Sequence, residues 1–284
     1  MTFLKADGEV FSHTEANTAL RARAVGKTKT TFGGDGSDGS RTVATSDTIA
    51  LTQAGYDYTN LTINTGQTLS GTGAKPEVLI IRCSGNLVIS GTGKLSVVGN
   101  GATNGTGETG ATSNDATTGA EGSWDASGVA MGGSGSNSGS GGGGGSWASG
   151  ISGGGANPGS GGLKNTLVIM DRPFYGAGGG GGAFGASDGA DGGKGGGAIL
   201  IQVAGNVTIE GSIDVSGEAA SASDEYGGGG GGAGSFVIFY KGTLTESTPT
   251  YTIAGGAGGV GNTSTGGAGG AGNYLIQKVW DGAD

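Results

Sequence analysis

Long glycine tracts constrain the fold of this chain more than any other feature, because 72 of its 284 residues are glycine and many stand in consecutive runs. The main tracts are residues 132–145, 153–155, 176–183, 192–197, 227–234, 255–261 and 266–272. Some have a G-G-X period of three, which is the period of a polyproline II helix. Such a helix has no internal hydrogen bonds, so its N–H and C=O groups can bond adjacent tracts. We therefore expect the tracts to pack together as polyglycine II, with flexible linkers as the alternative.

Short apolar runs rich in β-branched residues separate the tracts, and disordered chains lack such runs. Three clear examples are Val78–Ile81, Ala198–Ile201 and Ser235–Tyr240. The chain has no strict G-X-Y period and only 4 prolines, which excludes collagen. The sequence thus predicts a folded protein in which the glycine tracts are part of the ordered structure.

A unit of strand, turn and strand recurs along the chain. Gly85–Ile89 matches Gly205–Ile209, and Gly91–Val97 matches Gly211–Val215 with a small insertion. Copies of this kind bury one another's apolar faces. The predicted fold is all-β, with repeated short strand units and polyglycine II tracts packed in a sandwich or solenoid-like stack. Further strands are expected at residues 48–51, 58–64, 236–240, 251–254 and 274–277.

The N-terminal region contains the one helix that the sequence predicts, over residues 12–24. Ser12 and Glu15 fit a capping box, and the following alanines and arginines favour helix. A helix this short needs a partner, so we assign it to attachment on another chain. The candidate attachment residues are Leu20, Arg21 and Arg23. The expected domains are an attachment segment at residues 1–32, a β-strand module at residues 33–100, and a glycine-rich polyglycine II and β-repeat domain with display loops at residues 101–284.

Charge and hydropathy exclude several partners. The net charge is −9 and the 14 basic residues are scattered, whereas binding nucleic-acid phosphates needs clustered Lys and Arg. No apolar stretch approaches the length of a membrane span, and the N-terminus lacks the features of a secretory signal. The single cysteine, Cys83, excludes an internal disulfide and is expected to be a small buried hydrophobe. A stable surface protein without signal or disulfides fits a phage, which assembles in the cytoplasm and is released by lysis.

Residues suited to catalysis are few. His13 is the one histidine, so neither a Ser-His-acid triad nor a His-based metal site can form within one chain. Acidic pairs near loops have no evident acid or base partner; they are Asp188 with Asp191 and Asp224 with Glu225. We therefore expect no enzymatic activity and no cofactor.

Two short motifs resemble ligand sites. Val25–Thr28 ends like a phosphate-binding loop, but Arg21 stands where that motif requires glycine, and no strand precedes it. Gly33–Asp38 fits the start of a calcium-binding nonapeptide repeat, with Asp35 and Asp38 as candidate ligands. Because the motif occurs once and such sites need stacked tandem turns, a plain glycine–aspartate turn is favoured.

Aromatic residues gather in the segments that join the glycine tracts. Rings flanked by small polar residues are typical of adaptable binding loops, because a ring gives a large contact area at a small entropy cost. The alternative is that the rings cap the ends of the tracts. Residues 163–173 are too apolar for an idle loop, which favours exposure to a partner. The candidate receptor-binding residues are Trp124, Trp147, Phe174, Tyr175, Phe184 and Tyr226.

The segments Gly33–Gly39, Tyr58–Ile63 and Gly85–Ile89 resemble a glycine-rich module of phage and prophage tail or appendage proteins. The glycine tracts resemble those of the distal adhesins of T-even phage long tail fibres, over most of residues 33–284. The resemblance implies a polyglycine II sandwich whose loops recognise bacterial outer-membrane proteins or surface sugars. This chain differs from those adhesins because its strand units alternate with glycine tracts.

The sequence therefore predicts a virion protein on the extracellular surface, a tail fibre or appendage adhesin that binds the bacterial host through these loops. Other virion proteins would hold its N-terminal segment. Fibre tip, baseplate and capsid stay open as locations, and a single chain and a homotrimer stay open as states. A purely structural virion protein, such as a capsid decoration, head fibre or tail spacer, is the alternative. An ice-binding protein ranks third, because the threonines form no sustained ladder along the sequence.

Overall fold

The computed structural model describes residues 32–52, 54–73, 78–103, 176, 190–222, 227–261 and 265–279. These residues contain strands and no helix, which confirms the predicted all-β class for this part of the chain. The predicted helix at residues 12–24 lies outside the described residues. The strands are β1 (Arg41–Val43), β2 (Asp47–Ala50), β3 (Tyr56–Tyr58), β4 (Leu61–Ile63), β5 (Thr68–Thr72), β6 (Val78–Cys83), β7 (Leu87–Ile89), β8 (Lys94–Ser96), β9 (Ala198–Val203), β10 (Val207–Ile209), β11 (Ser212–Asp214), β12 (Ser235–Tyr240), β13 (Leu244–Glu246), β14 (Thr250–Thr252) and β15 (Asn273–Lys278).

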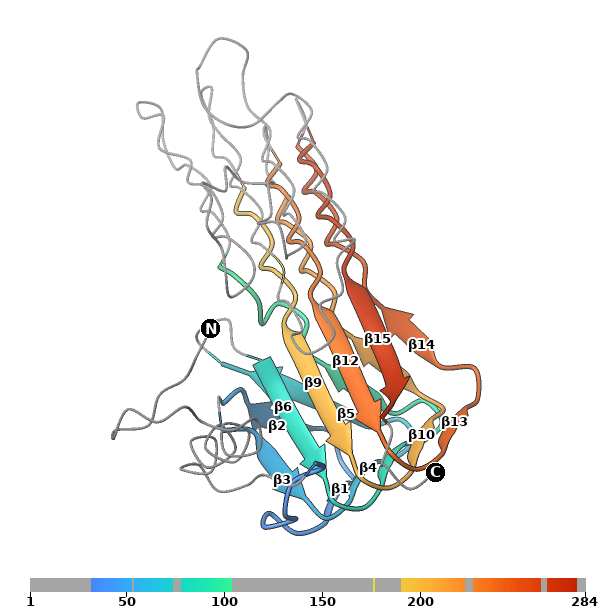
Figure 1. The fold of residues 1–284 in the computed structure, drawn as a ribbon. Coiled ribbons are helices and arrows are strands. Elements are labelled where there is room, and N and C mark those ends of the chain that lie inside the picture. Colours follow the sequence, from blue (N-terminus) through green and yellow to red (C-terminus); the bar gives the residue numbers. More distant parts are fainter. Residues whose placement is uncertain are drawn as a thin grey trace, which may run out of the picture.

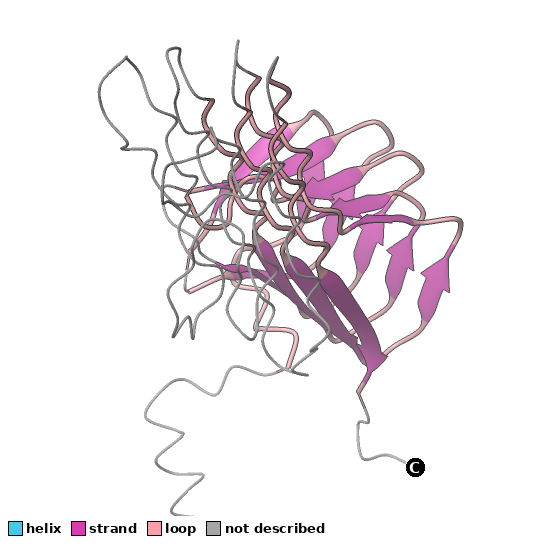
Figure 2. Ribbon diagram, turned by 90° about the horizontal axis from the view of Figure 1, so that it is seen from above, coloured by secondary structure: helices cyan, strands magenta, loops and turns pink. Residues whose placement is uncertain are grey.

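The strands form three parallel sheets of five strands, and each turn of the chain adds one strand to each sheet (Figure 1). Sheet 1 has the order β1-β4-β7-β10-β13, sheet 2 the order β2-β5-β8-β11-β14, and sheet 3 the order β3-β6-β9-β12-β15. We call each turn a coil, so that coil 1 is β1–β3 and coil 5 is β13–β15. Figure 2 shows the three sheets around a common interior. The arrangement is a three-sided parallel β-solenoid.

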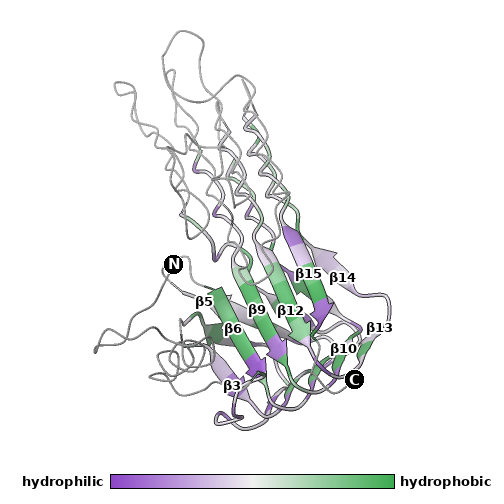
Figure 3. Cartoon of the chain, in the orientation of Figure 1, coloured by the Kyte–Doolittle hydropathy of each residue, from purple (hydrophilic) through white to green (hydrophobic). Residues whose placement is uncertain are grey.

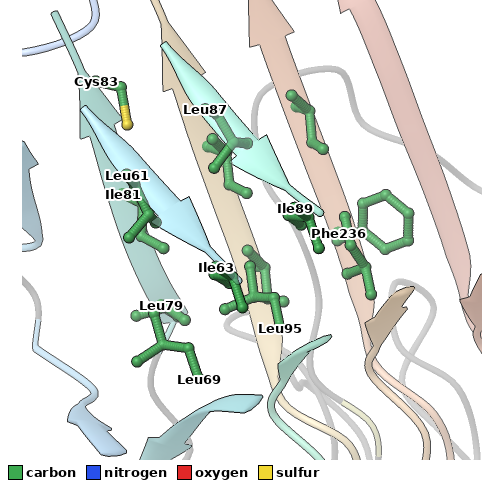
Figure 4. Packing of buried hydrophobic residues seen from close by; sticks show 14 of the residues in the cluster. Leu61, Ile63, Leu69, Leu79, Ile81, Cys83, Leu87, Ile89, Leu95 and Phe236 are labelled. Carbon is green, nitrogen blue, oxygen red and sulfur yellow. The ribbon is translucent and has the colours of Figure 1, made fainter. Parts of the chain in front are cut away.

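Alternating side chains place the apolar residues of each strand inside the coil. In β4, Leu61 and Ile63 are buried, and Thr62 between them points outward. Each inward residue lies over its counterpart in the next coil, since Leu61 pairs with Leu87 and Leu87 pairs with Val207. One core cluster of such residues extends through the coils (Figure 4). Because neighbouring strands lie about 4.8 Å apart, stacked aliphatic side chains fill this interior closely.

The repeat unit predicted from the sequence stacks in register. Gly85–Ile89 and Gly205–Ile209 lead into the adjacent strands β7 and β10, whose residues pair one to one. The prediction of a single strand over residues 58–64 is wrong, because the chain there forms the end of β3, a corner, and β4. The sequence does not predict β1 or β5, since the segments RTV and TLSGT are too short or too polar to give a strand signal.

An asparagine ladder occupies the corner that precedes sheet 1. Asn60 Oδ1 accepts the backbone N–H of Asn86 at 2.8 Å, and Asn86 Oδ1 accepts that of Asn206 at 2.8 Å. Asn206 Oδ1 in turn accepts the N–H of Thr243 at 2.8 Å. Each side chain thus satisfies a backbone donor of the following coil at a place where the chain turns. This corner explains why residues 58–64 do not form one strand.

The glycine tracts leave the solenoid at one corner, between the second and third strands of successive coils. The chain leaves after β8, β11 and β14, and it returns to β9, β12 and β15 respectively. Figure 1 shows the tracts side by side, beyond the ends of the sheet 3 strands. Every sheet combines strands from before and after residue 100, so the predicted segments 33–100 and 101–284 share one core. The described tract residues are 97–103, 190–197, 215–222, 227–234, 253–261 and 265–272.

The two ends of the solenoid differ in exposure. In coil 1, Val43, Ile49 and Tyr58 are only 2–4% exposed. In coil 5, Tyr274 is 41% exposed, although its ring stacks on Phe236 with 5.0 Å between the centroids. A cluster of three aromatic rings, Phe236, Tyr251 and Tyr274, therefore ends the core at coil 5, where the inward side chains are less covered than at coil 1.

Candidate binding end of the glycine tracts

Backbone hydrogen bonds join neighbouring antiparallel tracts at every third residue. The N–H of Gly256 donates to the C=O of Gly231 at 2.7 Å, and the N–H of Gly259 donates to the C=O of Gly228 at 2.8 Å. The donors are three residues apart along one tract, and the acceptors are three residues apart along the other. A step of three is the period of a polyproline II helix, whose peptide groups have no partner within their own helix.

Parallel tracts follow the same step. Gly230 bonds to Gly267 and Ala233 bonds to Gly270, both from N–H to C=O at 2.9 Å. A further parallel pair of bonds, both of 2.8 Å, runs from Gly193 to Gly229 and from Gly196 to Gly232. The tracts are therefore held by main-chain bonds in more than one direction, which makes them an array and not a set of separate loops.

Close approach of the backbones explains why the tracts consist of glycine. A Cβ atom on Gly231 would lie less than 3.0 Å from the carbonyl oxygen of Lys194, and one on Gly259 would be as close to that of Ser221. Among the described residues, every glycine with positive φ precedes residue 100, so the tracts do not need glycine for a left-handed backbone. They need it because no side chain fits between the strands of the array.

The far end of the array brings together three segment ends from different tracts. Ser221 N–H donates to Asp191 C=O at 3.1 Å, and Gly266 N–H donates to Gly259 C=O at 3.0 Å. The N–H of Gly259 donates to the C=O of Gly228, which connects these two contacts through neighbouring tracts. We call this region the distal end. The connecting segments 177–189, 223–226 and 262–264 each begin or end within a few residues of it.

The candidate receptor-binding aromatics all lie outside the described residues, in segments that connect described ones. Tyr226 directly precedes Gly227, and Phe184 lies in segment 177–189, so both belong to connections of the distal end. The flanks of segment 223–226 and the C-terminal flank of segment 177–189 therefore meet at the distal end. The sequence alone does not show this grouping, because the tracts that meet are far apart along the chain.

Two other candidates adjoin the opposite end of the array. Phe174 and Tyr175 directly precede Gly176, whose N–H donates to Gly196 C=O at 2.8 Å and whose C=O accepts the N–H of Ala102 at 3.0 Å. Gly196 is two residues before β9, so this contact lies at the base of the array, beside the solenoid. Trp124 and Trp147 lie in residues 104–175, the connection that leaves and returns at this base.

The candidate calcium residues belong to a tight turn. Asp35 Oδ1 accepts the backbone N–H of Ser37 at 2.9 Å, and the hydrogen bonds from Ser37 lower the pKa of Asp35. Asp38 Oδ2 accepts the backbone N–H of Asp57 in β3 at 2.7 Å. Both carboxylates thus accept a backbone N–H, that of Asp35 from within the turn and that of Asp38 from β3. The part of the chain that the structure describes has no group of three or more His, Cys, Asp or Glu residues placed to hold a metal ion.

The structure tests the predicted burial of Cys83 but not the predicted attachment residues. Cys83 is buried in the core, and burial raises the pKa of its thiol to about 12, which confirms the buried position. The attachment candidates Leu20, Arg21 and Arg23 lie outside the described residues. No helix with the length and hydrophobicity of a membrane span occurs in the ranges that the structure describes.

A column of threonines lies on the outer face of sheet 1. Thr42 pairs with Thr62 and Thr208 pairs with Thr245, with Val88 between the two pairs in the same register. The sequence hides this column, because the coils differ in length and the glycine tracts separate them. Four threonines thus share one face of sheet 1, but Val88 interrupts the column between Thr62 and Thr208.

The fold and site define a three-sided β-solenoid with a backbone-bonded glycine array projecting from one corner. No protein-family model, curated protein or solved structure matches this chain. Its function must therefore be argued from its own geometry.

Proposed function

We propose that this chain is a non-enzymatic receptor-binding adhesin of a virion, displayed on the extracellular surface of the particle. In this proposal the solenoid is the stem, and the glycine tracts form a polyglycine II bundle whose connecting loops bind the bacterial host. The observation that carries the proposal is the distal end, where hydrogen bonds hold together the flanks of segments 223–226 and 262–264 and the C-terminal flank of segment 177–189. A loop fixed at both ends on a rigid base loses less conformational entropy when it binds.

Composition supports the same proposal. The distal connections contain Phe184 and Tyr226, and aromatic rings among small polar residues are typical of binding loops. The receptor would be an outer-membrane protein or a surface polysaccharide. Residues 1–32, including Leu20, Arg21 and Arg23, would attach the chain to other virion proteins.

The test is binding of the purified, folded protein to intact host cells, together with competition against phage adsorption. We expect saturable binding that blocks adsorption. Phe184→Ala combined with Tyr226→Ala should weaken binding about tenfold or more, as loss of central aromatic contacts does. Thr208→Ala, on the outer face of sheet 1, is the matched control and should bind as the unchanged chain does.

Folded protein that neither binds cells nor blocks adsorption would exclude the adhesin and favour a purely structural virion role. If the double alanine variant keeps its cell binding and its unfolding temperature, the distal end is not the receptor site. Trp124→Ala with Trp147→Ala then tests the long connection at the base.

Binding to a regular surface such as ice is a second candidate, favoured by the threonine column. Strands of one sheet repeat at about 4.8 Å, so Thr42 and Thr62, and again Thr208 and Thr245, present hydroxyl and methyl groups one strand apart, with Val88 between the two pairs. Inhibition of ice recrystallisation by the purified protein would support this candidate. Thr62→Lys with Thr208→Lys should abolish that inhibition and leave cell binding unchanged, which separates the two functions.

A further inference from the structure

Charged side chains occupy inward strand positions of the solenoid only in its two end coils, among the strands that the structure describes. In coil 5, Glu246 is in register with Ile209 of coil 4, and Lys278 is in register with Tyr240. Figure 3 shows the hydrophilic end of β15, where the strand finishes with Gln277 and Lys278. In coils 2 and 3 the residues of the same two columns are apolar and belong to the core; they are Ile63, Ile89, Cys83 and Val203.

Coil 1 has the same feature at the opposite end of the stack. Arg41 is in register with Leu61, and Asp47 is in register with Leu69, so both occupy positions that are apolar in coil 2. The two side chains form an ion pair, with 2.8 Å between Arg41 Nη2 and Asp47 Oδ2. Both ends of the solenoid thus replace aliphatic side chains by charged ones.

Tyrosines connect the charged groups to the core at both ends. Arg41 Nη1 donates a hydrogen bond to the hydroxyl of Tyr58 at 2.9 Å, and the hydroxyl of Tyr251 donates to Glu246 Oε1. Tyr58 is buried in the core, and Tyr251 packs against it. A tyrosine suits this position because its ring covers apolar neighbours while its hydroxyl bonds a polar group.

The strands of the end coils are the edges of the three sheets. β1, β2 and β3 begin the sheets, and β13, β14 and β15 finish them, so each has a sheet neighbour on one side only. A coil of another chain could continue all three sheets at once, since the coils of this chain stack by the same in-register pairing. Natural proteins prevent such edge pairing with charged side chains that point inward, and repeat proteins need end repeats with a polar outer face.

Stacking of two copies end to end would enclose these charges in an apolar interior. If coil 5 of one copy continued into coil 1 of another, the columns would place Glu246 against Val43 and Lys278 against Tyr58. Burying an ionised group without a partner is strongly unfavourable. Without that cost, repeated stacking would produce open filaments, because head-to-tail contacts along one axis do not close.

We propose that Glu246 and Lys278 in coil 5, with Arg41 and Asp47 in coil 1, are caps that stop another copy of this chain from continuing the three sheets. The caps fix the length of the solenoid at five strands per sheet. A partner must then use the sheet faces or the glycine array instead of the strand edges. This inference goes beyond the proposed receptor site and does not depend on it.

The test removes the charges of coil 5 and measures self-association. Glu246→Ile with Lys278→Val restores the residue types of the two columns. It should lower the dissociation constant for self-association about tenfold or more, measured by sedimentation velocity over a range of concentrations. Hydrogen exchange locates the contact, because the β15 amides should gain protection as the concentration rises.

The matched control is Thr245→Ile with Gln277→Val, which makes the same kind of change at outward positions of the same strands. It should leave sedimentation and hydrogen exchange unchanged. Glu246→Lys separates the charge from the hydrogen bond with Tyr251, since it loses that bond but keeps a charged group at the inward position, and it should not associate. Adding Arg41→Leu and Asp47→Leu to the coil 5 pair uncaps both ends, and electron microscopy should then show filaments.

Three results would overturn the proposal. They are a coil 5 pair that sediments as the unchanged chain does at every concentration, equal association of the outward control, and concentration-dependent protection of β15 in the unchanged chain. Normal protection of the buried Leu87 amide shows that each variant is folded. If the coil 5 pair loses this protection, Lys278→Val alone takes its place and should show a smaller gain in association.

Discussion

The solenoid and the glycine array are held together by opposite means. In the solenoid, stacked side chains such as Leu61, Leu87 and Val207 fill the interior, and the backbones stay at the usual strand spacing. In the array, the backbones approach until no side chain fits, and main-chain hydrogen bonds recur at every third residue. A single chain thus builds one part from side-chain burial and the other from peptide groups alone.

The solenoid and the array should therefore lose stability through opposite kinds of substitution. Removing methyl groups weakens the solenoid, because the lost contacts leave a cavity. Adding a methyl group weakens the array, because the added atom has no space. The following predictions test this opposition, from the largest expected effect to the smallest.

Leu87→Ala should lower the free energy of unfolding by about 2–5 kcal/mol, because Leu87 is fully buried and stacked between coils 2 and 4. Urea unfolding followed by circular dichroism measures the change. The matched control is Val88→Ala, one residue away on the outer face, which should change stability by about 0.5 kcal/mol or less. Equal losses in both variants would mean that the interior is not the main source of solenoid stability.

Gly231→Ala should cost about 1–3 kcal/mol, because the new Cβ would collide with the carbonyl oxygen of Lys194. The damage should be local: hydrogen exchange of the Gly256 amide, which donates to Gly231, should accelerate, while the amide of Leu87 should keep its protection. Val260→Ala, at a tract position that is 64% exposed, is the control and should leave both amides unchanged. If the Gly256 amide keeps its normal protection in Gly231→Ala, the backbones of the array are not packed too closely to admit a Cβ atom at position 231.

Asn86→Ala should destabilise the protein by about 1 kcal/mol, because the backbone N–H of Asn206 loses its acceptor. Chemical denaturation measures this effect, and Asn86→Asp is the control, since it keeps an oxygen at the Oδ1 position. We expect the aspartate variant to retain more stability than the alanine variant. The reverse order would show that the ladder contributes little to the corner.

Asp214 should give the smallest effect, seen as a dependence on pH. Burial opposes ionisation of Asp214, but hydrogen bonds from Lys94 and Ser216 outweigh it and hold its pKa below the ordinary value of 3.8. The ion pair therefore contributes stability above pH 3.8, and this contribution disappears as the pH falls through the lowered pKa. The effect is small because Lys94 is 38% exposed, and water screens the pair.

Urea unfolding between about pH 5 and pH 2 tests this dependence. The unchanged chain should lose more stability over that interval than Asp214→Asn, which cannot ionise there. Parallel profiles for the two proteins would contradict a lowered pKa for Asp214.

Sequence patterns predict the stacked units well where an apolar run repeats. The match of Gly85–Ile89 with Gly205–Ile209 predicts two adjacent strands, and these strands pair in register. The same patterns fail at β1 and β5, because the segments RTV and TLSGT are too short or too polar to give a strand signal, although β1 pairs with β4 and β5 pairs with β8. They also fail across residues 58–64, because a corner depends on the asparagine ladder to the next coil.

The candidate binding end is predicted only in outline. The aromatic residues stand out in the sequence, but their grouping depends on which tract ends meet. Hydrogen bonds place the flanks of Tyr226 and the C-terminal flank of segment 177–189, which contains Phe184, at the distal end, and place Gly176, next to Tyr175, at the base. The threonine column on sheet 1 follows the same rule, since its members belong to coils that the glycine tracts separate.

The sequence by itself determined the all-β class, the repeated apolar unit, and the use of glycine where backbones pack closely. These properties are local, because strand periodicity and the absence of a side chain act on each residue directly. Only the tertiary structure decided that the strands divide into three parallel sheets, that every tract leaves from one corner, and that Thr42, Thr62 and Thr208 share one face. These three features depend on contacts between residues far apart in the sequence. Glycine tracts of unequal length change the number of residues between such contacts without changing how the coils stack, so no fixed sequence period reveals them.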